Sequence, residues 1–241
     1  MSDFALGPLP DSFATTRDHL HQIAFFALSP SRYRVVGRMG LRPQPGGFGT
    51  PDFDGRTVRV EGNLLVHQDG DSVATRTISS VRDAVEFFGN DYDVEWFSEF
   101  RDPLTPLDPE QQLDIDPEAT EALGQWFAFA WAVLEELKSH AVDGDDPSEV
   151  QLWPEHFDAA AELGDQSLGQ RASFGASPGD GGHPEPYIYV APWSEIDRSN
   201  PYWNDKSFNG SSLSYQELIE SDDPIPKAID FYLEGHRILH G

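Results

Sequence analysis

The sequence predicts an α+β fold in which one or two antiparallel sheets pack against a long central helix and terminal helices. Apolar residues recur at helical spacing in residues 12–28, 117–137 and 224–239. In residues 56–79, apolar and polar residues alternate and turn residues separate the runs, which is typical of antiparallel strands. Helical and strand patterns therefore occur as separate groups, and this separation favours α+β over alternating α/β.

The first half begins with an amphipathic helix over residues 12–28. Because Ser29-Pro30 follows, we expect this helix to end there. We expect residues 32–51 to form an extended segment that ends in a glycine-rich loop. After the strands, residues 80–89 have the spacing of a short helix that closes this half.

The second half is organised around the longest helical pattern of the chain. Asp116 is placed to cap this helix and Pro117 to occupy its first turn. An apolar stripe of residues one turn apart predicts that the helix lies at the centre of the core. We expect strands to follow at 149–153, 157–163, 169–176 and 186–192. Helices are expected at about 213–220 and about 224–239.

A chain of 241 residues is long enough to form one large core, so we expect a single compact domain over residues 1–241. The order of helix, strands and helix occurs twice, which suggests two pseudo-duplicated helix–sheet–helix halves, 12–89 and 116–241. Residues 90–115 are rich in proline and aspartate, and we expect them to form a packed loop that joins these halves.

Composition excludes several classes of function. The chain has 42 acidic and 16 basic residues, a net charge of −26 and no cysteine. An acidic surface repels phosphate backbones and anionic lipids, so we expect neither nucleic acid nor a membrane as partner. Without cysteine, disulfides and thiolate chemistry are absent. The first residues do not have the pattern of a signal peptide, and the longest apolar stretch, residues 126–134, is too short to span a bilayer, so we expect a cytoplasmic protein.

Four segments carry a resemblance to a known group of sequences: "GRMGLRPQPGGFGTP" (37–51), "LDIDP" (113–117), "VQLWPEHFD" (150–158) and "GASPGDGGHPEPYIYVAPW" (175–193). In this order they resemble a family of hypothetical actinobacterial proteins, over nearly the whole chain. The order of the predicted elements is also similar to that of a broader bacterial domain-of-unknown-function family. The resemblance implies a single intact module from a high-GC bacterium, and it implies no reaction, cofactor or catalytic residue.

Two polar segments of the second half contain the residue types of a catalytic or metal site. They supply two imidazoles and four carboxylates, from Glu155, His156, Asp158, Asp180, His183 and Glu185. Such a set is large enough for a divalent metal bound by two histidines and one carboxylate, and the predicted ligands are His156, His183 and Glu185. The proline after His183 and the proline after Glu185 hold both residues extended, which suits a ligand and equally suits an ordered surface loop.

Aromatic residues surround these segments, which is typical of a small-molecule pocket and also of a core. The predicted ligand-binding residues are Trp153, Asp180, Tyr187, Tyr189 and Arg42. Arg42 follows from a different argument, because a guanidinium binds an anionic ligand with two parallel hydrogen bonds, although it also pairs with acidic side chains. His236 and His240, on the last helix, are expected to be surface or capping residues.

The residues favour a small-molecule-binding protein or enzyme with its site at residues 151–193 and with metal-assisted, hydrolase-type chemistry. In this hypothesis His156 and His183 bind the metal or polarise the substrate, and Glu155 and Asp158 are further ligands or the general base. The alternative is a non-catalytic protein whose acidic surface binds a basic partner. The sequence leaves the substrate, the reaction class and the oligomeric state open.

Overall fold

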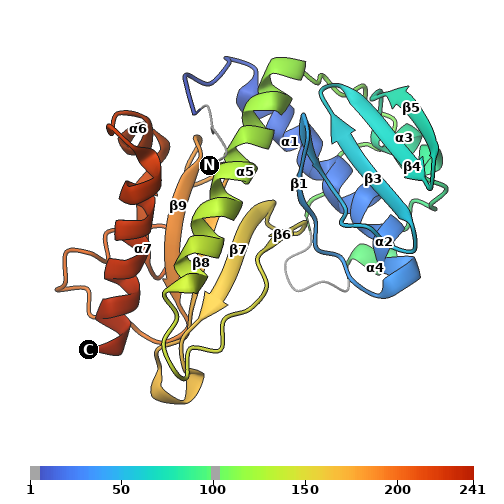
Figure 1. Ribbon diagram of the computed structural model, residues 1–241. Helices are drawn as coiled ribbons and strands as arrows, with labels where there is room; N and C mark the ends of the chain where they lie inside the picture. The colour runs from blue at the N-terminus through green and yellow to red at the C-terminus, as the bar shows by residue number, and fades with distance from the viewer. Residues whose placement is uncertain (1–5, 99–103) are drawn as a thin grey trace. The chain divides into compact units, whose positions relative to one another are not determined.

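Helices and two antiparallel five-stranded sheets make up the protein, which confirms the α+β class. The computed structural model describes residues 6–98 and 104–241 (Figure 1). The chain divides into two compact units. Unit 1 contains Met1–Phe127 and Leu152–Phe157, and unit 2 contains Ala128–Gln151 and Asp158–Gly241. The single domain predicted from the sequence stays a prediction, and residues 99–103 of the predicted loop lie outside the described residues.

The first helical segment is longer than the sequence predicts. It consists of α1 (Phe13–Ile23), a buried π-helical turn η1 (Ala24–Leu28) and α2 (Ser29–Val36). The expectation of a break at Pro30 was wrong, because this proline lies in the first turn of α2, where its missing N–H costs little. The helix ends at Gly37, whose φ of 67° is the left-handed conformation that glycine adopts readily.

The first sheet has the strand order β1-β2-β3-β4-β5 and is antiparallel throughout. Its strands are β1 (Arg42–Gln44), β2 (Gly47–Gly49), β3 (Arg56–Glu61), β4 (Leu64–Asp69) and β5 (Ser72–Thr77), and α3 (Val81–Phe87) and α4 (Val94–Phe97) follow. The glycine-rich loop of the sequence therefore includes strand residues. A Cβ atom at Gly47 would lie 2.4 Å from the Val60 carbonyl oxygen, and one at Gly124 would lie 2.9 Å from the Gly47 nitrogen. These glycines permit close backbone packing.

The long central helix is α5 (Pro117–Ser139). Asp116 accepts a hydrogen bond from the Glu118 amide over 2.9 Å, as an N-terminal cap does, so the predicted start of this helix is confirmed. The predicted apolar stripe is buried, with Leu123 and Leu134 fully covered. Among the residues that the structure describes, no helix combines the length and the apolar character that crossing a membrane requires.

The second sheet has the order β10-β9-β8-β7-β6. Its strands are β6 (Gln151–Trp153), β7 (Asp158–Leu163), β8 (Ala172–Ser177), β9 (Tyr187–Pro192) and β10 (Ser211–Ser214). The short helix η2 (Gln166–Leu168) separates two strands, and α6 (Tyr215–Ile219) and α7 (Pro224–His240) end the chain. Helix α7 runs beside this sheet (Figure 1), and its buried Tyr232 donates a hydrogen bond to the Gly175 carbonyl over 2.7 Å. This contact fixes the helix on strand β8.

Candidate metal centre

The predicted site residues Trp153, Glu155 and His156 lie in unit 1: Trp153 ends β6, and the other two lie on the turn that follows it. The Phe157 amide donates to the Trp153 carbonyl over 2.7 Å, and Phe157 has a positive φ of 57° although it is not glycine. His156 is exposed and Glu155 is half-buried. Arg42, the predicted anion ligand, is also in unit 1 and is exposed at the start of β1.

A half-buried histidine, His21, holds this turn in place. Nε2 of His21 lies 2.9 Å from the Pro154 carbonyl oxygen and 3.2 Å from the Glu155 carbonyl oxygen. Carbonyl oxygens only accept hydrogen bonds, so Nε2 carries the proton. The ring stacks on Phe157 with centroids 5.0 Å apart. Burial lowers the pKa of His21 to about 4, so the ring is neutral at pH 7.

Unit 2 brings five of the predicted residues into a connected group: Asp158, Asp180, His183, Tyr187 and Tyr189. The Tyr189 hydroxyl donates to the Asp158 carboxylate, and the Tyr187 hydroxyl donates to the Asp180 carboxylate over 2.6 Å. The His183 ring lies against Tyr187, with centroids 4.2 Å apart. Burial, with a smaller contribution from the neighbouring carboxylates, raises the pKa of both tyrosines, so both stay protonated donors.

His183 is bound to a carboxylate that the sequence does not single out. Its Nε2 lies 2.9 Å from Oδ2 of Asp205. That carboxylate also accepts hydrogen bonds from the amide and hydroxyl of Ser207 and from the hydroxyl of Ser212. Burial raises its pKa, but these donors outweigh burial and lower it to about 2. We call His183, Asp205, Ser207 and Ser212 the Asp205 cluster; the exposed Glu185 is not part of it.

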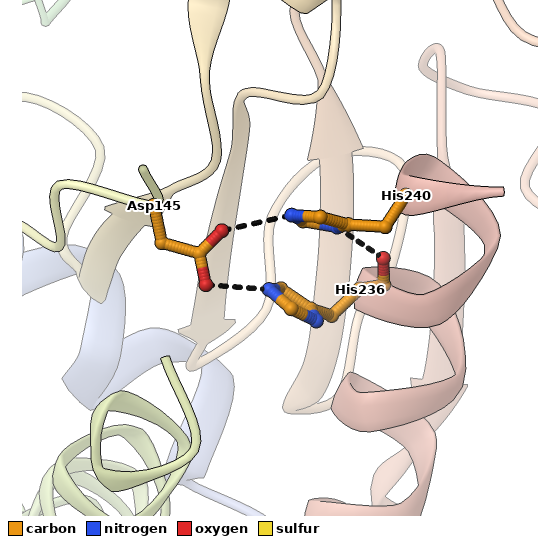
Figure 2. A group of neighbouring side chains, drawn as sticks. All are labelled: Asp145, His236 and His240. Atoms are coloured by element: carbon orange, nitrogen blue, oxygen red, sulfur yellow. Dashed lines mark hydrogen bonds and ion pairs between the residues drawn. The ribbon is translucent and has the colours of Figure 1, made fainter. Parts of the chain in front are cut away.

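A second imidazole–carboxylate group in unit 2 was missed by the sequence analysis. Asp145 lies in the segment between α5 and β6, and His236 and His240 lie one turn apart near the end of α7 (Figure 2). Nε2 of His236 lies 2.8 Å from Oδ2 of Asp145, and Nε2 of His240 lies 2.8 Å from Oδ1. We call these three residues the Asp145 cluster. The expectation that both histidines are surface or capping residues was wrong, because both rings face this one carboxylate.

The Asp145 carboxylate is charged despite its burial. Its side chain is fully buried, and the Val142 amide donates to Oδ2 over 2.7 Å. Burial raises its pKa, but the hydrogen bonds from Val142 and from the two histidines more than offset burial, so that the pKa lies below its ordinary value. A buried negative charge at this place favours a cation beside it.

The two nitrogens of the His240 ring face different acceptors. Nδ1 lies 2.8 Å from the carbonyl oxygen of His236, so Nδ1 carries a proton. In the neutral ring, Nε2 then has a lone pair, and this lone pair points at Oδ1 of Asp145. Two acceptors cannot face each other at hydrogen-bond distance unless a positive charge lies between them. That charge is either a second ring proton or a metal ion.

Within residues 6–98 and 104–241, Asp145, His236 and His240 are the group of three whose ligand atoms all lie within 4.8 Å of one another. The predicted ligand set of His156, His183 and Glu185 stays a prediction, because His156 belongs to unit 1 and the other two residues to unit 2. No protein-family model, no curated protein and no solved structure matches the chain.

Proposed function

We propose that this protein binds a divalent transition-metal ion, of the zinc class, through Asp145, His236 and His240. The observation that carries the proposal is the hydrogen bond from His240 Nδ1 to the His236 carbonyl. Histidines that bind metals commonly donate their second ring N–H to a carbonyl or a carboxylate, and this bond fixes the tautomer whose lone pair faces the metal. The bond to the His236 carbonyl favours that tautomer for the neutral His240 ring.

The donor set suits this class of ion. Two imidazole nitrogens and one carboxylate bind Zn²⁺ and Fe²⁺ in preference to Mg²⁺ or Ca²⁺, which prefer oxygen ligands. A tetrahedral zinc places its ligand atoms about 3.3 Å apart, so the nitrogen–oxygen pairs that now lie 2.8 Å apart would separate by about half an ångström. Both histidines lie in the last turns of α7, where the helix dipole favours a cation.

Three protein ligands leave at least one position of a tetrahedral ion for water or substrate, which is the arrangement of catalytic zinc sites. We therefore infer metal-assisted, hydrolase-type chemistry on a small molecule, in which the ion would lower the pKa of a bound water. The net charge of −26 supports a partner other than nucleic acid. The same charge supports the alternative of a non-catalytic protein that binds a basic partner.

Metal content tests the proposal. The chain is purified without chelator, its metal is measured by elemental mass spectrometry, and the metal-free protein is titrated with Zn²⁺ in a calorimeter. The variants are His236→Ala/His240→Ala and, as a matched control, His156→Ala/His183→Ala, with circular dichroism to confirm folding. We expect near-stoichiometric binding that only the first variant loses. Loss in the control pair alone would favour the ligands predicted from the sequence, and no binding by the wild type would leave the acidic interaction protein.

A hydroxamate tests the open position. Added to the Co²⁺-substituted protein, acetohydroxamate should change the visible absorption of the ion, because it takes a coordination position that the protein does not fill. An unchanged spectrum would mean that the protein fills every position of the ion, as structural sites do, and the catalytic part of the proposal would then be wrong.

A further inference from the structure

Arg171, at the start of the segment that leads into β8, is bound to the loop that carries Asp145. Its Nη1 donates to the Asp146 carbonyl over 3.1 Å and to the Gly164 carbonyl over 3.3 Å, and it lies 3.5 Å from the Asp145 carbonyl oxygen. Its Nη2 donates to the Glu162 carboxylate over 3.0 Å. One guanidinium therefore joins three backbone carbonyls and one carboxylate, which its planar set of donors permits.

The position of this guanidinium is itself fixed. The Arg171 side chain is 13% exposed, and the Trp193 ring lies 5.5 Å from its central carbon. The Trp193 amide donates to the Arg171 carbonyl over 3.0 Å, which joins the backbone of the two residues as well. The head group thus lies in a defined place beside the loop, and its rotamer freedom is small.

The loop that Arg171 holds is a strained one. Asp146 has a φ of 43° although it is not glycine, and it precedes Pro147, which restricts its backbone further. Gly144, on the other side of Asp145, has a φ of 98°. The Gly164 amide donates to the Asp145 carbonyl over 2.8 Å. Such a backbone persists only where the surroundings hold it, and here the Arg171 contacts are part of what holds it.

We propose that Arg171 is a positioning residue for the metal ligand Asp145: its hydrogen bonds hold the strained loop so that the carboxylate faces His236 and His240. This inference rests on the proposed metal centre and adds to it the residue that sets the geometry of its carboxylate. Arg171 itself donates to carbonyls and to Glu162, so it acts on the metal only through the backbone of Asp145 and Asp146.

The charge of Arg171 makes the test decisive. A positive side chain near a bound cation repels it, so removal of the charge alone strengthens metal binding. A positioning role predicts the opposite, because the loop relaxes and the carboxylate moves away from the imidazoles. The sign of the change in affinity therefore separates the two effects.

The experiment measures the Co²⁺ affinity and the visible spectrum of the wild type, Arg171→Met and Arg171→Lys. Arg237→Met is the control, since Arg237 follows His236 on α7 but pairs with Glu234 in solvent. We expect Arg171→Met to weaken Co²⁺ binding at least about 10-fold, in the range of losses seen when a partner of a metal ligand is removed, and to alter the spectrum. Arg171→Lys keeps the charge but lacks the planar donors, so its affinity should also fall. Arg237→Met should retain the wild-type affinity or bind slightly more tightly.

Hydrogen exchange of the metal-free protein gives a readout that does not depend on metal. Faster exchange of the Gly164 and Val142 amides in Arg171→Met, with global unfolding unchanged, would support the proposal. Equal Co²⁺ affinity in the wild type and both Arg171 variants would overturn it while leaving the metal centre intact. If the wild type binds no Co²⁺ and no Zn²⁺, the proposed function fails, and with it the role of Arg171.

Discussion

The Asp145 cluster and the Asp205 cluster both place an imidazole nitrogen within 2.9 Å of a buried carboxylate, but they differ in what else the groups contact. Asp205 accepts hydrogen bonds from Ser207 and Ser212 as well as from His183. Neutral hydroxyl and amide donors therefore stabilise much of the negative charge of this carboxylate. The Asp145 carboxylate accepts a hydrogen bond from the Val142 amide and otherwise faces the imidazoles of His236 and His240. When the His240 ring is neutral, its one proton is on Nδ1, which faces the His236 carbonyl and not Asp145.

On this difference rests our proposal that Asp145 is a metal ligand and that the Asp205 cluster is structural. Both oxygens of the Asp205 carboxylate accept hydrogen bonds, and a carboxylate satisfied in this way is stable without an added cation. A lone pair that faces a buried carboxylate needs a positive charge between the two atoms, which is either a second ring proton or a metal ion. Both clusters join imidazole to carboxylate at nearly the same distance, 2.8 Å and 2.9 Å, so the proposal depends on the tautomer and on the number of donors.

Of the substitutions proposed here, Asp145→Asn should have the largest effect on metal binding. The amide keeps the size of the side chain but removes the charge and one metal ligand, so Zn²⁺ affinity should fall roughly 100-fold or more, beyond the loss from a partner of a ligand. Calorimetric titration measures it. Asp146→Asn, which removes the same charge from the next, exposed residue, should bind like the wild type. Equal losses in both variants would show that net charge, not ligation, controls binding.

His21 provides a third kind of histidine, whose Nε2 faces two backbone carbonyls. Its pKa is about 4 in the folded chain against an ordinary 6.5, so the unfolded chain takes up the proton first as the pH falls. Its contribution to stability is complete above about pH 6.5 and is lost between about pH 6.5 and pH 4, by about 3 kcal/mol. Urea unfolding at several pH values measures the difference between the wild type and His21→Gln. Parallel pH profiles for the two would contradict the assignment of a neutral ring with a lowered pKa.

Asp205→Asn tests whether the Asp205 cluster is structural. The variant loses charge-assisted hydrogen bonds in a buried place and should reduce the free energy of unfolding by about 2 kcal/mol. Zn²⁺ affinity should not change. A loss of metal with unchanged stability would reverse the roles that we assign to the two clusters.

The smallest effect is expected at an exposed imidazole–carboxylate pair. Nε2 of His140 lies 3.4 Å from Oε1 of Glu136, one helical turn away, and both side chains are exposed. His140→Ala should change stability by no more than about 0.5 kcal/mol and should leave metal binding unchanged. A larger change in thermal unfolding would mean that distance alone, without burial, gives such pairs their strength.

Much of the fold could be predicted because the signals are local. The cap at Asp116, the buried stripe of α5 and four strands of the second sheet follow from spacing and turn residues, with ends that shift by one to three residues. The continuation of the first helix through Pro30 could not, since it depends on the buried π-helical turn before it. The sequence does not separate strand β10 from the helix predicted at about 213–220, because its four residues are too few to show alternation.

The site was harder to predict because its parts are far apart in the sequence. The spacing of His236 and His240 places both on one helix face, which is a signal available from the sequence. Their carboxylate lies some ninety residues earlier, in a loop with no motif of its own. The tautomer of His240 depends on a backbone carbonyl, which no residue pattern reveals.

Anomalous diffraction at the zinc absorption edge, from crystals grown with Zn²⁺, would show whether Asp145, His236 and His240 bind the ion. We expect one peak about 2.0–2.2 Å from Nε2 of His236, Nε2 of His240 and a carboxylate oxygen of Asp145. A peak at His183 or His156, or no peak while the Asp145 cluster keeps its hydrogen bonds, would contradict this expectation.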